Sequence, residues 1–122
     1  MLVRERVSAA SIVATAMIAY VEARAALARR RNAGDLSAGE HRRLVSEFES
    51  DWERYVRLDL TGGLIREAAA LADRYRLRAY DAIHLAAAVT VRRRLEGDVV
   101  FACWNTELEA AASRERFELL RR

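Results

Sequence analysis

The stretch AIHLAAAV, residues 82–89, most limits how this chain can fold, because His84 is its only polar residue. A helix that is apolar on nearly every side must be covered by other elements on nearly every side. The sequence therefore predicts a buried helix over residues 80–95, which Gly97 ends.

Short β-rich segments alternate with helical patterns along the rest of the chain. Strands are predicted over residues 11–15, 56–60, 98–104 and 117–120. Helices are predicted over 17–31 (closed by Gly34), from the capping box Ser37–Glu40 to Tyr55, over 61–75, and from a second capping box, Thr106–Glu109. This alternation predicts an α/β fold with a parallel sheet and right-handed crossovers. Since proline is absent and no linker or repeat is visible, we expect residues 1–122 to form a single domain.

Two of the predicted helices carry apolar stripes at helical spacing, which we expect to face the core. The stripes comprise Ile18, Val21, Ala25 and Ala28 in the first helix, and Ile65, Ala69, Ala72 and Tyr75 in the third.

The composition is that of an ordinary soluble protein, with 52% hydrophobic and 32% charged residues. No apolar run approaches the roughly 20 residues of a membrane span. The single cysteine, Cys103, excludes an internal disulfide and suits a reducing compartment, so we expect a cytoplasmic protein. Every basic residue is arginine and the net charge is +3. Guanidinium groups bind phosphate well, but codon bias is the simpler explanation for the missing lysine.

In open α/β sheets, ligands bind at the carboxyl ends of the strands. The polar residues predicted there are Glu22, Asp81, Asn105 and Thr106. Asp81 precedes the apolar helix, where it is either a helix cap or a functional ligand, or both.

Each of the other candidates also has a purely structural explanation. Glu22 can pair with a nearby arginine such as Arg24 or Arg78. His84 is more simply a core residue than a metal ligand, because the chain has no second well-spaced histidine. Asn105 can start the following helix. If the carboxylates instead converge, they suit Mg²⁺, which prefers oxygen ligands, and the hypothesis is then metal-assisted phosphodiester hydrolysis.

Three segments together resemble a known family. ATAMIAYVEARAALARR (14–30), LRAYDAIHLAAA (77–88) and VVFACWNTELEAAA (99–112) are similar to the PIN-domain toxins of bacterial VapBC toxin–antitoxin pairs, and the resemblance runs from about Ser11 to the end. It implies a PIN-like three-layer α/β/α fold with a parallel sheet. It also implies an endoribonuclease dependent on Mg²⁺ or Mn²⁺, a small VapB-like antitoxin that covers the site, and a homodimer.

The resemblance also assigns roles to individual residues. Glu22 and Asp81 match two of the family's four acidic metal-binding positions, and Asn105 falls where the family usually has an aspartate. Thr106 follows as an auxiliary polar group, while Arg24 and Arg78 are candidates for holding the RNA backbone.

The chain departs from the family pattern in two respects. The family's first strand, which ends in an aspartate, is not in this sequence, and by resemblance it lies in the middle of the sheet. Strands 11–15 and 98–104 should then either pair directly or leave exposed edges. Because one acidic position is absent and Asn105 replaces another, the alternative function is an impaired or inactive module that retains antitoxin or RNA binding. A third possibility is a small α/β scaffold that binds nucleic acid non-specifically.

Overall fold

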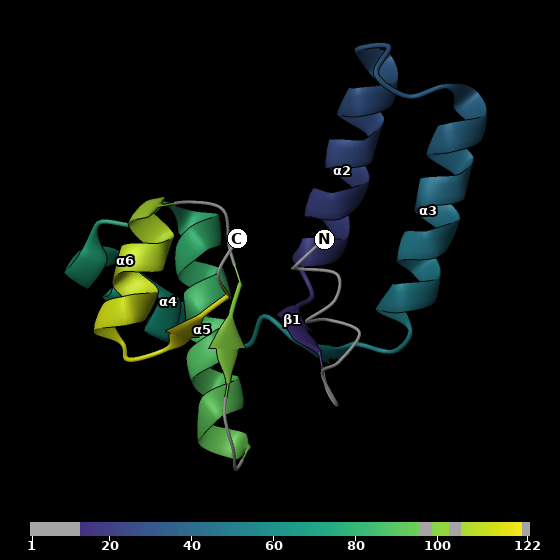
Figure 1. Ribbon diagram of the computed structural model, residues 1–122. Coiled ribbons are helices and arrows are strands. Elements are labelled where there is room, and N and C mark those ends of the chain that lie inside the picture. The colour runs from purple at the N-terminus through teal and green to yellow at the C-terminus, as the bar shows by residue number, and fades with distance from the viewer. Residues whose placement is uncertain (1–12, 96–98, 103–105, 121–122) are drawn as a thin grey trace.

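A computed structural model describes residues 13–95, 99–102 and 106–120 (Figure 1). The elements follow the predicted alternation of strands and helices. In chain order they are β1 (Ala14–Ala16), α2 (Ala19–Asn32), α3 (Ala38–Trp52), β2 (Val56–Leu58), α4 (Gly62–Tyr75), α5 (Ala79–Arg94), β3 (Val100–Phe101), α6 (Thr106–Arg114) and β4 (Glu118–Leu119). The strands are shorter than predicted, and α3 ends at Trp52 rather than Tyr55.

The strands form two separate parallel pairs. β1 pairs with β2, with Ala14 opposite Val56, and β3 pairs with β4, with Val100 opposite Glu118. The predicted parallel pairing is confirmed, but within the described residues the two pairs are not joined into the single predicted sheet. Among the described residues β1 and β3 are not paired with each other, so the first alternative, direct pairing of these strands, is wrong.

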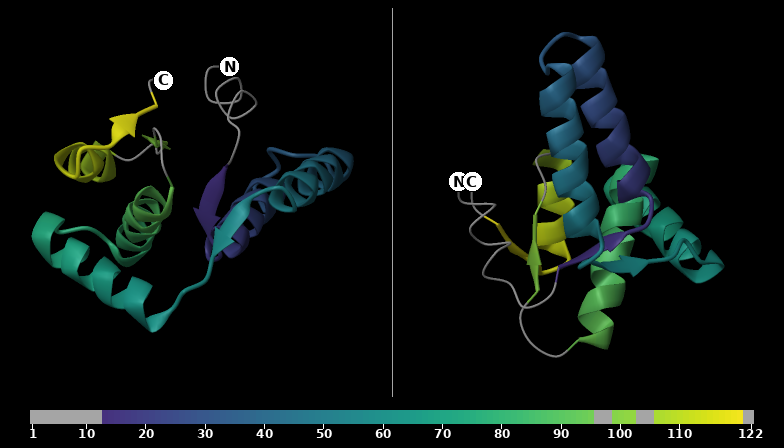
Figure 2. Two further views of the ribbon diagram at one scale, coloured as in Figure 1. Left: turned by 90° about the horizontal axis from the view of Figure 1, so that it is seen from below. Right: turned by 90° about the vertical axis from the view of Figure 1, so that its right-hand side faces the viewer.

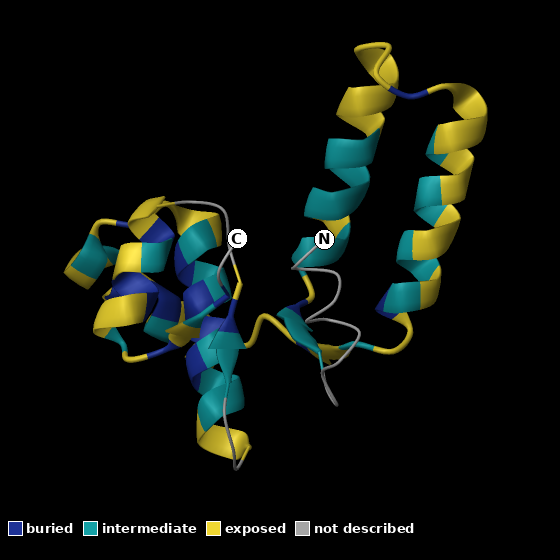
Figure 3. Ribbon diagram, in the orientation of Figure 1, coloured by how far each residue is buried: buried dark blue, intermediate teal, exposed yellow. Residues whose placement is uncertain are grey.

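Helix α5 is the centre of the core, as its apolar sequence predicts. It packs against α4, β1 and α6, and Leu85 and Ala86 are completely buried. Burial of a leucine side chain such as Leu85 contributes about 2 kcal/mol to folding. Figure 3 shows the buried residues concentrated around α5 and its neighbours α4 and α6.

Helices α2 and α3 form a hairpin that extends away from this core (Figure 2). No residue of α2 is buried, and Val21 is 65% exposed. Ile18, directly before the helix, packs against the core as predicted, but the predicted core-facing stripe does not continue along α2. The reason is that α2 packs mainly against α3 and not against the sheet. The hairpin has its own aromatic cluster, in which the rings of Tyr20 and Phe48 each lie within 6 Å of Trp52 (centroid distances 5.3 and 5.7 Å).

The buried face of α4 is shifted by one residue from the predicted face. Leu64, Ala68 and Leu71 are buried, whereas Ile65 and Ala69 are exposed. Ala72 and Tyr75 of the predicted stripe are half-buried. The helical period was predicted correctly, but both stripes have that period, and only packing against α5 selects between them.

Capping residues determine where α3 and α4 begin. The predicted capping box is confirmed: Ser37 Oγ accepts from the Glu40 backbone N–H at 3.0 Å, and Glu40 Oε1 accepts from the Ser37 N–H at 2.8 Å. The Ser37 backbone N–H is the main cause of the lowered pKa of Glu40. The Thr61 hydroxyl accepts from the Leu64 N–H at 3.1 Å and so caps α4.

Helices α2, α4 and α6 end in the same way. After each helix, one residue adopts a positive φ, namely Gly34 (85°), Arg76 (55°) and Arg116 (68°). The following N–H then returns to a carbonyl five residues earlier, as in the Leu77 to Ala72 bond of 3.2 Å after α4. This is the bonding of a Schellman motif, and Leu77 anchors it by being buried.

No helix within the described residues is long and apolar enough to cross a membrane.

The helix ends yield a stability prediction. Arg76 has a conformation that is costly for any residue with a Cβ, so Arg76→Gly should raise the free energy of unfolding by roughly 0.5 to 1 kcal/mol. Gly34 has the same type of conformation with no atom near its missing Cβ, so Gly34→Ala should lower that free energy by about 1 kcal/mol through backbone strain alone. Urea unfolding of both variants measures the two changes in the free energy of unfolding. Changes of the same sign in the two variants would contradict this account.

Candidate active site

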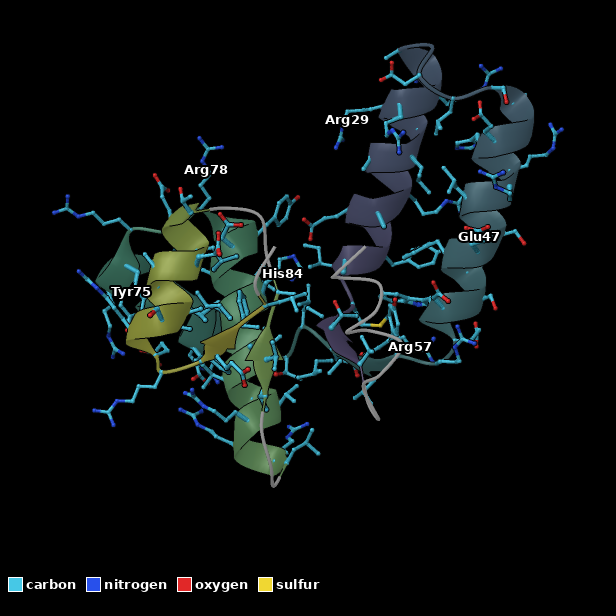
Figure 4. The ribbon with its side chains drawn as sticks, in the orientation of Figure 1. Arg29, Glu47, Arg57, Tyr75, Arg78 and His84 are labelled. Carbon is cyan, nitrogen blue, oxygen red and sulfur yellow. The ribbon has the colours of Figure 1, made fainter. Side chains whose placement is uncertain are left out.

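A contact between Glu22 and His84 connects α2 to α5. His84 Nε2 lies 2.7 Å from Glu22 Oε1, and the two residues are 62 positions apart in the sequence. The side chains are 37% and 26% exposed for Glu22 and His84 respectively, so the pair lies at the surface with part of each group covered. Figure 4 shows His84 pointing from α5 towards the side where α2 lies.

The fold explains why Glu22 is positioned here. Helix α2 starts three residues after β1 ends, and α5 packs against β1, so the first turn of α2 faces α5. Glu22 lies in that first turn, where the helix dipole favours a carboxylate. The predicted location of Glu22, beyond the carboxyl end of the first strand, is therefore confirmed.

Asp81 lies in the first turn of α5 but is not its cap. The N-cap residue is Arg78, whose side chain makes no capping bond, and Asp81 is the third residue of the helix. Since residues three apart share one face of a helix, Asp81 lies on the side of α5 that carries His84. The Glu22–His84 contact thus brings Glu22 to the same side of α5 as Asp81.

Arg24 is engaged on the opposite side of α2 from the expected site. Its Nη1 donates to Glu49 Oε1 of α3 at 2.9 Å, and the Tyr20 hydroxyl also bonds to Glu49. The Glu49 bond raises the pKa of the Tyr20 hydroxyl. Arg24 therefore does not pair with Glu22, so that structural explanation of Glu22 is wrong. The Arg24 guanidinium is held by Glu49 within the hairpin.

Arg78 is exposed and directly precedes α5. In Figure 4 its side chain extends away from the ribbon. Within the described part of the chain it forms no ion pair with Glu22, whose partner is His84.

Thr106 and Asn105 are the two remaining candidates. Thr106 is exposed and is the first residue of α6, and the predicted capping box at Thr106–Glu109 stays a prediction. Asn105 lies outside the described residues, and its placement in the site stays a prediction. Cys103 also lies outside them.

The donor chemistry of Glu22 and Asp81 fits a hard divalent cation. Mg²⁺ commonly takes one or two protein carboxylates and keeps several waters. In Glu22, Oε1 is bound to His84, which fixes the carboxylate and leaves Oε2 for another partner. The described residues do not form a cluster of three or more potential ligands from histidine, cysteine, aspartate and glutamate. Glu22, His84 and Asp81 therefore do not together form such a cluster.

Sequence reasoning underestimated His84. Because the chain lacks a second histidine spaced for zinc, the sequence favours a core role for His84. In the structure His84 is half-buried, and it is the residue that holds Glu22. Two signals pointed to this role: Glu22 requires a polar partner where it is partly covered, and His84 shares the helix face of Asp81.

The chain is similar to two curated ribonucleases of Mycobacterium tuberculosis. Ribonuclease VapC45 of strain CDC 1551 / Oshkosh and ribonuclease VapC49 of strain H37Rv are each 36% identical to it over 101 residues. The matched region is 78% of this chain, and it spans 64% of the length of each relative. No family model matches the chain, and no solved structure matches it.

The Glu22–His84 contact can be tested by a double-mutant cycle. Glu22→Gln and His84→Gln should show a coupling of about 0.5 to 1 kcal/mol in the free energy of unfolding, because each removes the same partly covered bond. The matched control replaces His41 of α3, which is also half-buried, by glutamine. His41→Gln should add to Glu22→Gln without coupling. Coupling that is equal for both histidines would show that Glu22 and His84 do not interact specifically.

Proposed function

We propose that this chain, which belongs to the VapC-type ribonuclease family, hydrolyses RNA phosphodiester bonds as the toxin of a type II toxin–antitoxin pair. The observation that carries the proposal is the Glu22–His84 contact. It brings a carboxylate from α2 to the face of α5 that carries Asp81. These two carboxylates occur in the segments that carry the family resemblance, YVEAR and YDAIH.

We propose that Glu22 and Asp81 hold Mg²⁺ or Mn²⁺, with the amide oxygen of Asn105 as a neutral third ligand. When bound, such an ion supplies Lewis-acid stabilisation of the charge on the reacting phosphate. His84 restricts the orientation of the Glu22 carboxylate by bonding to Oε1. Asp81 lies in the first turn of α5, close to the positive end of the helix dipole. We propose that Arg78, which is exposed directly before α5, binds a phosphate of the RNA backbone.

The partner we propose is a small VapB-like antitoxin that covers this site in the cytoplasm, with the toxin itself as a homodimer. Two large apolar side chains support a covering protein, because each directly precedes a site carboxylate. Val21 is 65% exposed beside Glu22, and Tyr80 is 56% exposed beside Asp81. Adjacent helix residues point about 100° apart. A polypeptide that covers the carboxylates and also wraps around both helices would therefore remove both side chains from water, which is favourable by about 25 cal/mol per Å² of apolar surface.

A second candidate is a module that retains the fold and binds RNA or antitoxin but does not cleave. The observation that favours it is the donor set: among the described residues, Glu22 and Asp81 do not belong to a cluster of three ligands. A cation held by two carboxylates and a neutral amide would bind more weakly than one held by four carboxylates.

Cleavage of a mixed pool of cellular RNA separates these candidates. The folded chain should produce discrete cuts with Mn²⁺ and none with EDTA. Asp81→Asn should reduce the cleavage rate at least about 100-fold. Mutating even a residue that only orients a metal ligand commonly lowers metal affinity or activity by about 10- to 100-fold. The matched control is Asp73→Asn on the exposed side of α4, which should cleave like the unaltered chain.

Two outcomes would overturn the proposal. Cuts that persist in EDTA and in Asp81→Asn would exclude the proposed metal site. A folded chain that does not cleave but binds RNA would favour the second candidate.

A further inference from the structure

We infer that Arg29 of α2 binds a phosphate of the RNA strand, so that the substrate runs from the Glu22–Asp81 site along one face of this helix. The inference rests on the proposed function and assigns the direction in which the RNA lies. Arg29 takes the role in substrate binding that Arg24, which is held by Glu49, does not fill.

Helical periodicity puts Arg29 on the face of α2 that carries Glu22. Arg29 follows Glu22 by seven positions, which is nearly two complete turns, and the two residues differ in direction by about 20°. The rise along the helix over this distance is about 10.5 Å. This exceeds the reach of one side chain, so Arg29 would contact a phosphate further along the strand than the one at Glu22.

The two neighbouring arginines point elsewhere. Arg31 Nη1 donates to the Leu36 carbonyl at 3.2 Å and so belongs to the turn of the hairpin. Arg30 lies near the start of α3, where its charge adds a minor contribution to the lowered pKa of Glu40, after the bonds from Ser37 and the charge of Arg43. Arg31 is therefore directed to the hairpin, and Arg30 projects about 100° away from Arg29 around the helix axis.

Arg29 is directed to the other side. It is exposed, and within the described residues it forms no ion pair. In Figure 4 its side chain points away from α3, towards the side where α5 lies. Arg78 extends from the start of α5, next to Asp81. Arg29 of α2 and Arg78, directly before α5, therefore each present an exposed guanidinium, the group that binds phosphate oxygens in pairs.

The helix dipole alone does not account for this arrangement. Arginines in the last turn of α2 stabilise its negative end, but Arg29, Arg30 and Arg31 share that effect. What distinguishes Arg29 is its direction. The neighbour Arg30 is therefore a matched control, with the same charge, the same helix end and a different face.

The test is binding of a short, fluorescently labelled single-stranded RNA of mixed sequence, followed by anisotropy in EDTA. Arg29→Gln should raise the Kd roughly three- to fivefold, the effect of one exposed charge contact. It should also reduce the slope of log Kd against log salt concentration by about 0.7, the value for one phosphate of a single strand. Arg30→Gln should change the Kd less than about twofold. Circular dichroism checks that both variants keep the helical signal of the unaltered chain.

Equal weakening by the two variants would overturn the inference, because it would indicate a general charge effect. So would an unchanged Kd in Arg29→Gln, or an unaltered chain that does not bind RNA. Failure here is distinguishable from failure of the proposed function. If Asp81-dependent cleavage occurs while Arg29→Gln and Arg30→Gln behave alike, only the path of the RNA is wrong. If Arg29→Gln selectively weakens binding and no cleavage occurs, the chain binds RNA along α2 without cutting it.

Discussion

The hydrogen bond between Glu22 and His84 determines how the proposed site is assembled. The α2–α3 hairpin has its own aromatic cluster and contributes no residue of α2 to the buried core. Its first turn nevertheless has to face α5 for the two carboxylates to act together. The short β1 strand brings that turn to α5, and the 2.7 Å contact fixes it there. Because both side chains are partly exposed, the bond is modest in energy, and its importance lies in orientation.

The apolar character of α5 has a structural reason in this arrangement. Alanines such as Ala82 and Ala86 allow α4, α6 and β1 to approach the helix closely, while Leu85 fills the interior. Within the apolar stretch 82–89 of α5, His84 is the only polar residue, and it faces α2 one turn after Asp81. The arginines Arg92, Arg93 and Arg94 lie at the other end of the helix.

Much of this could be predicted from residues alone, and the failures have physical causes. Ser37–Glu40 and Gly34 identified helix ends correctly because capping is a local interaction. The stripe on α2 and the face of α4 were wrong because periodicity gives the spacing of apolar residues but not which element covers them; Val21 and Ile65 remain exposed. The partner of Glu22 could not be read from nearby arginines, since it lies 62 positions away, and Arg24 binds Glu49 across the hairpin.

Paramagnetic broadening by Mn²⁺ in the amide spectrum of the folded chain tests most directly whether α2 and α5 form one site. The account predicts that amides around Glu22 and around Asp81 broaden together at the lowest Mn²⁺ concentration, before those near the acidic residues Glu47 and Glu49 of α3. Broadening that starts on α3, or that affects Glu22 without Asp81, would contradict the claim that the Glu22–His84 contact builds a shared cation site.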